Sequence, residues 1–243
     1  MATSITNTSV TTDDLIVDTN TLKVDSTNNH VGFGTATPQA PIDATLAAGN
    51  DWVARFQNTT SATPYCVQVY DAPSAANAYP LLQVTNSAGS GTYFRVDSGT
   101  GIVTKPNQPS FLMKKYSGGS NAIPVNSVWT FDEALSNVGS NANISNGRFT
   151  APVAGTYCFM WHNIGEGSST VYRSFIRKNG SSAWGTGSYR LESRNYHSQG
   201  YPNASAQVVV ALAATDYVDI YLEGGAIYSD TTNGVWFCGF LIG

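Results

Sequence analysis

The segment 131–159 constrains the fold more than any other part of the chain, because it places a turn and a strand at fixed positions. Asn146-Gly147 is a dipeptide typical of tight hairpin turns, and residues 148–150 continue as a short strand. After a Pro152-x-x-Gly155 break, aromatic residues alternate with others, a period of two that predicts a strand with two different faces. We expect an inner face that packs inside a β-sandwich and an outer face directed away from it. The inner residues are Tyr157, Phe159 and Trp161, and the outer residues are Cys158, Met160 and His162.

The composition favours the same class for the whole chain. Of 243 residues, 12% are charged and 23 are glycine, and Leu, Lys and Glu are scarce beside Ser, Thr and Asn. Helix formers are therefore few, whereas strand and turn formers are plentiful. Short alternating segments separated by Gly, Asn, Ser and Pro predict an all-β protein with a sandwich or barrel.

Further strand-like segments follow the same rules across residues 108–243. They are 108–111, 176–180 with its Lys-Asn-Gly turn, 204–212, 216–222 and 237–242. Together with Phe131, Asn137, Phe149, Gly155, Tyr157 and Phe159, this pattern resembles the globular head domain of complement's first component, a jelly roll of the tumour-necrosis-factor type. Two positions depart from the family pattern: Ala142 replaces an aromatic residue and Thr215 replaces a glycine.

The resemblance implies a homotrimeric binding head rather than an enzyme. In related heads the sheet that contains the 155–162 strand lines the trimer axis, so the outer face of that strand is expected there. The residues implied at the trimer axis are Cys158, Met160, His162, Cys238 and Phe240.

The segment 22–42 has a different sequence pattern, in which short alternating strands are separated by glycine-rich turns. It resembles a phrase common in bacteriophage tail-fibre proteins, through Val24, Asp25, Ser26, Asn29, Val31, Gly32, Gly34, Thr35 and Pro38. Residues 1–50 hold too few apolar side chains for a core of their own, because small units bury too little surface. We expect them to be ordered by trimerisation into a β shaft with short hairpins, the alternative being a disordered tail.

Three domains are therefore expected. Residues 1–50 would form an attachment and shaft segment, 51–107 a small β domain and linker, and 108–243 the jelly-roll head. Pro106 and Pro109 suit an extended joint into the head.

Three cysteines, Cys66, Cys158 and Cys238, make an odd count. We favour three reduced, buried thiols, since no export signal is visible in the polar residues 1–12; a Cys158–Cys238 pair is the alternative that the resemblance leaves open. His30, His162 and His197 lie far apart and no Asp-rich loop occurs, so neither a metal nor a cofactor is expected.

The loops in 184–203 combine aromatic, glycine and polar residues, a mixture that suits sugars and protein epitopes. The candidate receptor-binding residues are Trp184, Tyr189, Arg190, Arg194, Tyr196 and Tyr201. The alternative for each ring is that it fills the core or the trimer interface.

Several functions are disfavoured by the sequence. A net charge of −4 argues against nucleic acid as a partner, and no apolar run is long enough to insert in a membrane. Sugar hydrolysis needs two carboxylates in one cleft, and Asp216 and Asp219 look like turn and surface residues.

These observations predict a non-enzymatic virion structural protein: a trimeric phage tail fibre that anchors to other virion proteins through its N-terminus. Its head would bind a host cell-surface glycan or protein. The predicted location is a tail appendage assembled in the host cytoplasm. The alternatives are a capsid decoration or head fibre with a structural role, and a small polysaccharide-cleaving tail spike.

Overall fold

The computed structural model describes residues 14–17, 21–25, 27–44, 80–85, 91–97, 100–166, 171–185, 189–196, 200–232 and 234–243. These residues form strands and turns, and the described ranges contain no helix that could span a bilayer. The chain divides into two compact units, Met1–Tyr70 and Asp71–Gly243.

The first unit contains a four-stranded sheet in the order β1-β2-β3-β4. Its strands are β1 (Asp14–Val17), β2 (Leu22–Asp25), β3 (His30–Phe33) and β4 (Ile42–Ala44). β1, β2 and β3 pair as short antiparallel hairpins, as predicted, whereas β4 pairs parallel to β3. The β2–β3 turn forms because the Asp25 carboxylate accepts hydrogen bonds from the backbone N–H groups of Thr27 (3.1 Å) and Asn28 (3.2 Å).

The second unit begins with a three-stranded sheet of β5 (Pro80–Thr85), β6 (Thr92–Asp97) and β7 (Val103–Thr104). Leu82 and Val84 of β5 are about half exposed, at 47% and 50%. Residues 51–79 of the predicted domain 51–107 lie outside the described residues. The three-domain division remains a prediction.

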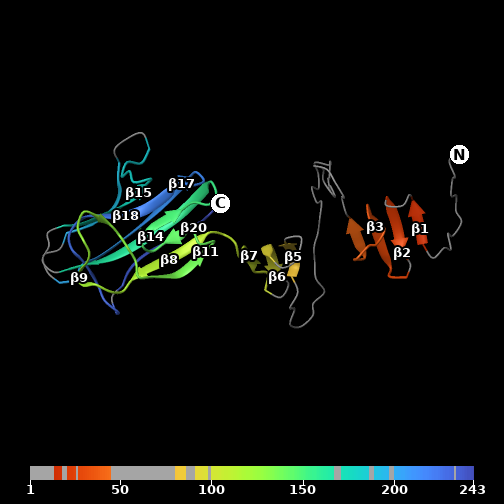
Figure 1. Cartoon of the computed structure of the whole chain (residues 1–243), viewed down its shortest axis with the longest axis horizontal. Helices are drawn as coiled ribbons and strands as arrows, with labels where there is room; N and C mark the ends of the chain where they lie inside the picture. Colours follow the sequence, from red (N-terminus) through yellow and green to blue (C-terminus); the bar gives the residue numbers. More distant parts are fainter. Residues whose placement is uncertain are drawn as a thin grey trace, which may run out of the picture. The chain divides into compact units, whose positions relative to one another are not determined.

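The head is a β-sandwich of two sheets, in agreement with the predicted jelly-roll class (Figure 1). The first sheet has the order β11-β8-β20-β14-β19-β9, with β17 pairing along the other side of β14. Its strands are β8 (Ser110–Lys115), β9 (Gly119–Ile123), β11 (Glu133–Val138), β14 (Gly155–Gly165), β17 (Asn203–Leu212), β19 (Ile227–Ser229) and β20 (Val235–Leu241).

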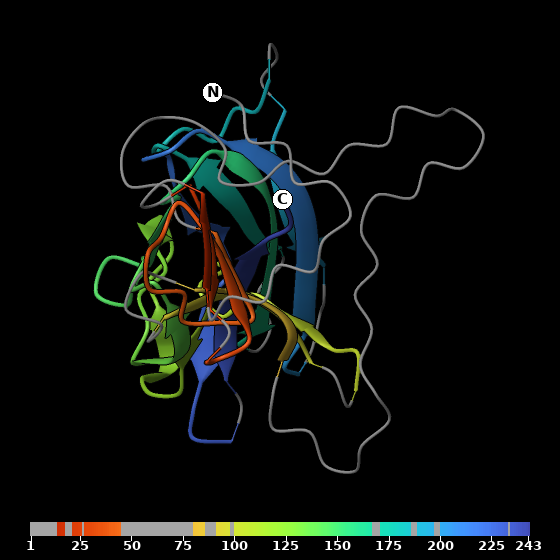
Figure 2. The ribbon, with the colours of Figure 1, turned by 90° about the vertical axis from the view of Figure 1, so that its right-hand side faces the viewer.

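The second sheet has the order β12-β13-β18-β15-β16, with the short β10 pairing to β18. Its strands are β10 (Ser127–Val128), β12 (Ala142–Asn143), β13 (Arg148–Thr150), β15 (Tyr172–Lys178), β16 (Leu191–Asn195) and β18 (Tyr217–Gly224). Figure 2, turned by a right angle, shows the curved strands of the head from another side.

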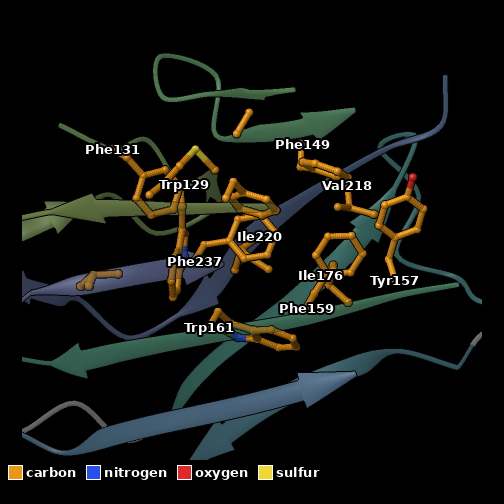
Figure 3. Packing of buried hydrophobic residues seen from close by; sticks show 14 of the residues in the cluster. Trp129, Phe131, Phe149, Tyr157, Phe159, Trp161, Ile176, Val218, Ile220 and Phe237 are labelled. Carbon is orange, nitrogen blue, oxygen red and sulfur yellow. The ribbon is translucent and has the colours of Figure 1, made fainter. Parts of the chain in front are cut away.

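Aromatic rings fill the space between the sheets (Figure 3). The Phe111 ring stacks on Phe149 with centroids 4.8 Å apart and meets Phe237 edge-on at 4.9 Å. The predicted inner residues Tyr157, Phe159 and Trp161 are each 0% exposed, which confirms the two-faced strand. The period of two along β14 therefore sets both the core and the opposite, outward surface.

Local backbone geometry explains the sequence signals in the turns. Gly147 has φ 66°, and a Cβ atom there would lie 1.8 Å from the carbonyl oxygen of Trp129, so only glycine fits. Ala142, in place of the expected aromatic residue, pairs across the ladder with Phe149 and is itself buried. Thr215, in place of the expected glycine, adopts φ 73°, which is strained backbone for a β-branched residue.

Candidate functional site: two outer faces and a pocket of the head

One outer surface of the sandwich is apolar. Along β14, Cys158 lies opposite Phe240 and Val209, and Met160 lies opposite Cys238 and Gln207. All of these point away from the core, because their strand neighbours point into it. Phe240 is 41% exposed and Val209 is 61% exposed. We call this surface the apolar face and define it by Cys158, Met160, Val209, Cys238 and Phe240.

All five residues predicted for the trimer axis lie on this side of the sandwich, since His162 follows Met160 at the same spacing. The His162 ring stacks on Trp236 with centroids 5.7 Å apart, and its Nδ1 lies 2.9 Å from the Ser205 hydroxyl. Burial lowers the pKa of His162, so the imidazole is neutral at pH 7. Whether these residues meet a trimer axis remains a prediction.

The two cysteines of the apolar face are free thiols. They occupy neighbouring strands but diagonal positions, because Cys158 pairs with Phe240 and Cys238 with Met160. Burial, with a smaller contribution from Cys158, raises the pKa of Cys238 to about 11, which keeps its thiol protonated at pH 7. Cys66 lies outside the described residues.

The opposite outer surface is polar and highly paired. Arg177 donates to Asp219 through Nε to Oδ1 (2.7 Å) and Nη2 to Oδ2 (3.1 Å), while the side chain of Asp219 is 0% exposed. Asp219 is therefore a buried structural carboxylate, which corrects the expectation that it is a surface residue. The Nε of Arg148 lies 3.6 Å from the same carboxylate.

Arginine–aromatic stacking completes this surface. The guanidinium groups of Arg148 and Arg177 lie 4.1 Å and 4.6 Å from the ring centroids of Tyr217 and Tyr221. Such stacking is favourable because the ring face carries partial negative charge. Glu223 joins Arg173 (2.5 Å) and Arg190 (2.7 Å). We call this surface the charged face, formed by Arg148, Arg173, Arg177, Arg190, Tyr217, Asp219, Tyr221 and Glu223.

The residues predicted to bind a receptor separate into different environments. Trp184 packs against the core and its indole Nε1 donates to the carbonyl of Ile176 (3.0 Å), so its ring has a structural role. Arg190 belongs to the charged face and lies 4.8 Å from the Phe175 ring. Tyr189 and Tyr196 are exposed, at 79% and 71%, and Arg194 is exposed on β16.

Tyr201 differs from the other exposed tyrosines because it lines a pocket of about 250 Å³. The other lining residues are His162, Ile164, Asn203 and Tyr228. The Tyr201 and Tyr228 ring centroids are 5.0 Å apart at 53°. Sequence reasoning included Asn203 in the 184–203 loops but missed Tyr228, because only strand pairing brings Tyr228 beside Ile164.

Most carboxylates of the head have structural partners. Asp132 accepts hydrogen bonds from the backbone N–H groups of Tyr116 and Ser117, and Glu166 accepts one from Asn121. Within the described ranges, no three His, Cys, Asp or Glu side chains are grouped to hold a metal ion.

The fold defines a jelly-roll head of two antiparallel sheets, and the comparisons with known proteins give its family. Residues 110–242, more than half of the chain, match the model of the C1q domain family. The chain belongs to this family, and the resemblance seen in the sequence of the head is confirmed.

Two curated relatives show how far the sequence of this chain has diverged from other proteins of the family. Complement C1q tumor necrosis factor-related protein 3 of Homo sapiens and that of Mus musculus are each 26% identical over 117 residues, 48% of this chain. The match spans 45% of each relative, less than half of its length. Among solved structures, the globular domain of zebrafish complement 1qA is 23% identical with a TM-score of 0.45, covering 56% of this chain and 98% of that one. Murine APRIL is 9% identical with a TM-score of 0.43, covering 56% and 99%.

The predicted location is wrong. A tail appendage of a phage virion, assembled in the host cytoplasm, conflicts with curated relatives that are human and mouse proteins. The comparisons give no support for attachment to other virion proteins.

Proposed function

We propose that the protein is a non-enzymatic homotrimeric adhesin whose C1q-type head binds a receptor on a cell surface. The apolar face is the observation that carries this proposal. A single subunit would leave the Phe240 and Val209 side chains in water, at 41% and 61% exposure, beside Met160 and two thiols. Apolar surface of this kind on one face of a sheet marks a protein interface.

Copies of the same chain are the partners that we assign to this face. Its central residues carry no charge, so a second apolar face could cover them without leaving an unpaired ion. The outward side chains of β17, an outer strand of this sheet, are exposed, whereas Cys158, Met160 and Cys238 on β14 and β20 are half-buried and Phe240 near the end of β20 is exposed. The residues that would lie at the centre of the trimer are thus the predicted set Cys158, Met160, His162, Cys238 and Phe240.

Receptor binding would then use surfaces that the trimer leaves free. Tyr189, Tyr196 and Tyr201 support this assignment, because exposed tyrosines offer a flat apolar ring with a polar edge. The receptor group is a glycan or a protein. Three equal sites on one trimer would raise the avidity by orders of magnitude when they engage together.

The N-terminal part would act as a fibre-like stalk. The short hairpins of β1 to β3 and the resemblance of segment 22–42 to fibre proteins support this role. In this proposal residues 1–50 are the attachment segment, 51–107 the intermediate domain and linker, and 108–243 the binding head.

A non-enzymatic role is supported by the partners of the carboxylates. Asp219 and Glu223 are held by arginines, and Asp216 is held by Lys178 at 2.7 Å. Carboxylates neutralised in this way are poor candidates for the acid and base of glycoside hydrolysis.

Native mass spectrometry and equilibrium sedimentation of the full chain test the assembly. We expect one species with the mass of three chains at micromolar concentration. A folded monomer with the same far-UV spectrum would overturn the proposal. Binding of the labelled full chain to intact cells of several types tests the adhesin role, and absence of saturable binding to every cell type would refute it.

A further inference from the structure

The pocket beside Tyr201 is built on a row of three neighbours in one sheet. Ile164, near the end of β14, pairs with Asn203 of β17 on one side and with Tyr228 of β19 on the other. Directly opposed residues point to the same side of a sheet, so all three face outward together with His162. The floor of the pocket is therefore the apolar Ile164 side chain between two polar groups.

Tyr201 provides a wall with a free ring face. The residue after it, Pro202, is buried, and its carbonyl accepts a hydrogen bond from the backbone N–H of Gly165 (2.6 Å). The chain is thus fixed beside the ring, while one side of the ring rests against Tyr228. Because Tyr201 is nevertheless 62% exposed, the rest of its ring is available as a platform.

The rim of the pocket carries hydrogen-bonding groups. The Tyr228 hydroxyl donates to Oδ2 of Asp230 (2.8 Å), which leaves its oxygen able to accept. His162 uses Nδ1 toward Ser205, so Nε2 is its remaining polar atom. The Asn203 side-chain amide makes no hydrogen bond to the residues that the structure describes, and it brings both donors and an acceptor.

The charge around the pocket is neutral to negative. None of the described residues that line it is Lys or Arg, and burial keeps His162 neutral at pH 7. The hydrogen bond to Asp230, burial and the charges of Asp230 and Glu166 raise the pKa of Tyr228. Anionic groups such as carboxylate, sulfate or phosphate would therefore be repelled.

We propose that this pocket binds one neutral hexose residue of a cell-surface glycan. The apolar ring of Tyr201 would stack on the C–H face of the sugar, while the Asn203 amide and the Tyr228 hydroxyl would bind its hydroxyl groups. A volume of about 250 Å³ is below the roughly 300–1,000 Å³ of sites for drug-sized ligands, which suits a single ring. The inference rests on the proposed function, because it names the ligand class of the same head.

Saturation-transfer NMR with the full chain tests the ligand class. The probes are the methyl glycosides of glucose, galactose, mannose and N-acetylglucosamine at millimolar concentration. The methyl glycoside of sialic acid serves as the anionic comparison, and Nα-acetyl-lysine methylamide as a cationic one. We expect transfer to at least one neutral hexoside and none to the sialoside. Equal or stronger transfer to the sialoside or to the lysine derivative overturns the proposal. Absence of transfer to every hexoside also overturns it, and this is the result expected if a neighbouring subunit covers the pocket.

Two tyrosine variants locate the site. Tyr201→Ala should weaken binding of the active hexoside at least tenfold, whereas Tyr93→Ala, which removes a ring that is 51% exposed on β6 outside the pocket, should leave it unchanged. Unchanged melting temperature and native mass in both variants would exclude a folding effect. Hexoside binding that survives Tyr201→Ala refutes the assignment of this pocket.

Cell adhesion separates the two proposals. If the wild-type chain binds cells but no hexoside, the pocket assignment fails and the adhesin role stands. If it binds hexosides but no cell, the adhesin role fails and the pocket stands.

Discussion

The apolar face and the charged face lie on opposite sides of the same aromatic core, but their side chains are satisfied in different ways. On the charged face every arginine lies within 4.0 Å of a carboxylate of the same subunit, and the buried Asp219 carboxylate accepts two hydrogen bonds from Arg177. On the apolar face Met160, Cys238 and Phe240 lie at or near the surface, and their partners across the ladder include the uncharged residues Cys158, Gln207 and Leu112. In the proposed assembly the charged face is therefore complete in a single chain, and the apolar face is covered by further copies.

Among substitutions that test this difference between the two faces, a charge at the centre of the apolar face should have the largest effect on assembly. Met160→Asp should abolish the trimer, because three carboxylates would be buried without partners and each costs several kcal/mol. Sedimentation should show a monomer. Thr150→Glu, an exposed position on β13 of the opposite sheet, is the matched control and should remain trimeric. A trimeric Met160→Asp protein would show that subunits contact each other elsewhere.

The converse change removes the central carboxylate of the charged face. Asp219→Asn should lower the free energy of unfolding by about 3 kcal/mol, because Arg177 would keep its charge in a largely buried site. The native mass should stay that of the assembled protein, since this face is satisfied within one chain. Chemical denaturation measures the first effect and native mass spectrometry the second.

Glu192→Gln provides the control for this loss. Glu192 lies 4.0 Å from Arg173 and both side chains are about one-third exposed, so we expect a change below about 1 kcal/mol. Equal losses in the two variants would contradict the view that Asp219 anchors the charged face.

Sequence periodicity predicted the inner and outer faces of β14 but not the charged face on the opposite sheet or its internal pairs. The alternation through Tyr157, Phe159 and Trp161 was sufficient for the core of β14, because neighbouring residues of a strand must point to opposite sides. The pairing of Arg177 with Asp219 depends on which strand lies beside β15, and sequence spacing does not contain that information. Asp219 therefore looked like a surface residue.

The candidate site was predictable to a similar extent. The outer residues of β14 and the exposed Tyr189, Tyr196 and Tyr201 follow from the sequence. The packing of the Trp184 ring against the core could not be predicted from the sequence. It depends on how the chain folds between β15 and β16, which brings the indole within hydrogen-bonding distance of the Ile176 carbonyl. Tyr228 joins Tyr201 only through the pairing of β14 with β19 and β17.

A turn mutation separates backbone strain from the contacts of either face. Thr215 precedes β18 with φ 73°, and its backbone N–H donates to Ala151 (2.8 Å), so this geometry is held in place. Thr215→Gly should raise the free energy of unfolding by about 1 kcal/mol, because glycine adopts positive φ without the Cβ clash, although it gains entropy in the unfolded chain. Denaturant titration measures the change. A loss of stability would mean that the threonine side chain compensates for the strain.

The smallest expected effect is the loss of stability in acid, which should depend on the charged face and not on the apolar face. At the edge of the charged face, Asp216 bonds to Lys178, Asn179 and the backbone N–H of Ala213, and these bonds lower its pKa to about 2. An unfolded aspartate titrates near 3.8, so the folded state is favoured by this group above that pH, and the contribution is lost as the pH falls from about 4 to about 2. The melting temperature should fall over this range, and Asp216→Asn should reduce the slope while being less stable at pH 6. The apolar face has no carboxylate among its defining residues, so Met160→Leu should retain the wild-type slope between pH 4 and pH 2. If Asp216→Asn retains it as well, other carboxylates of the charged face dominate acid unfolding.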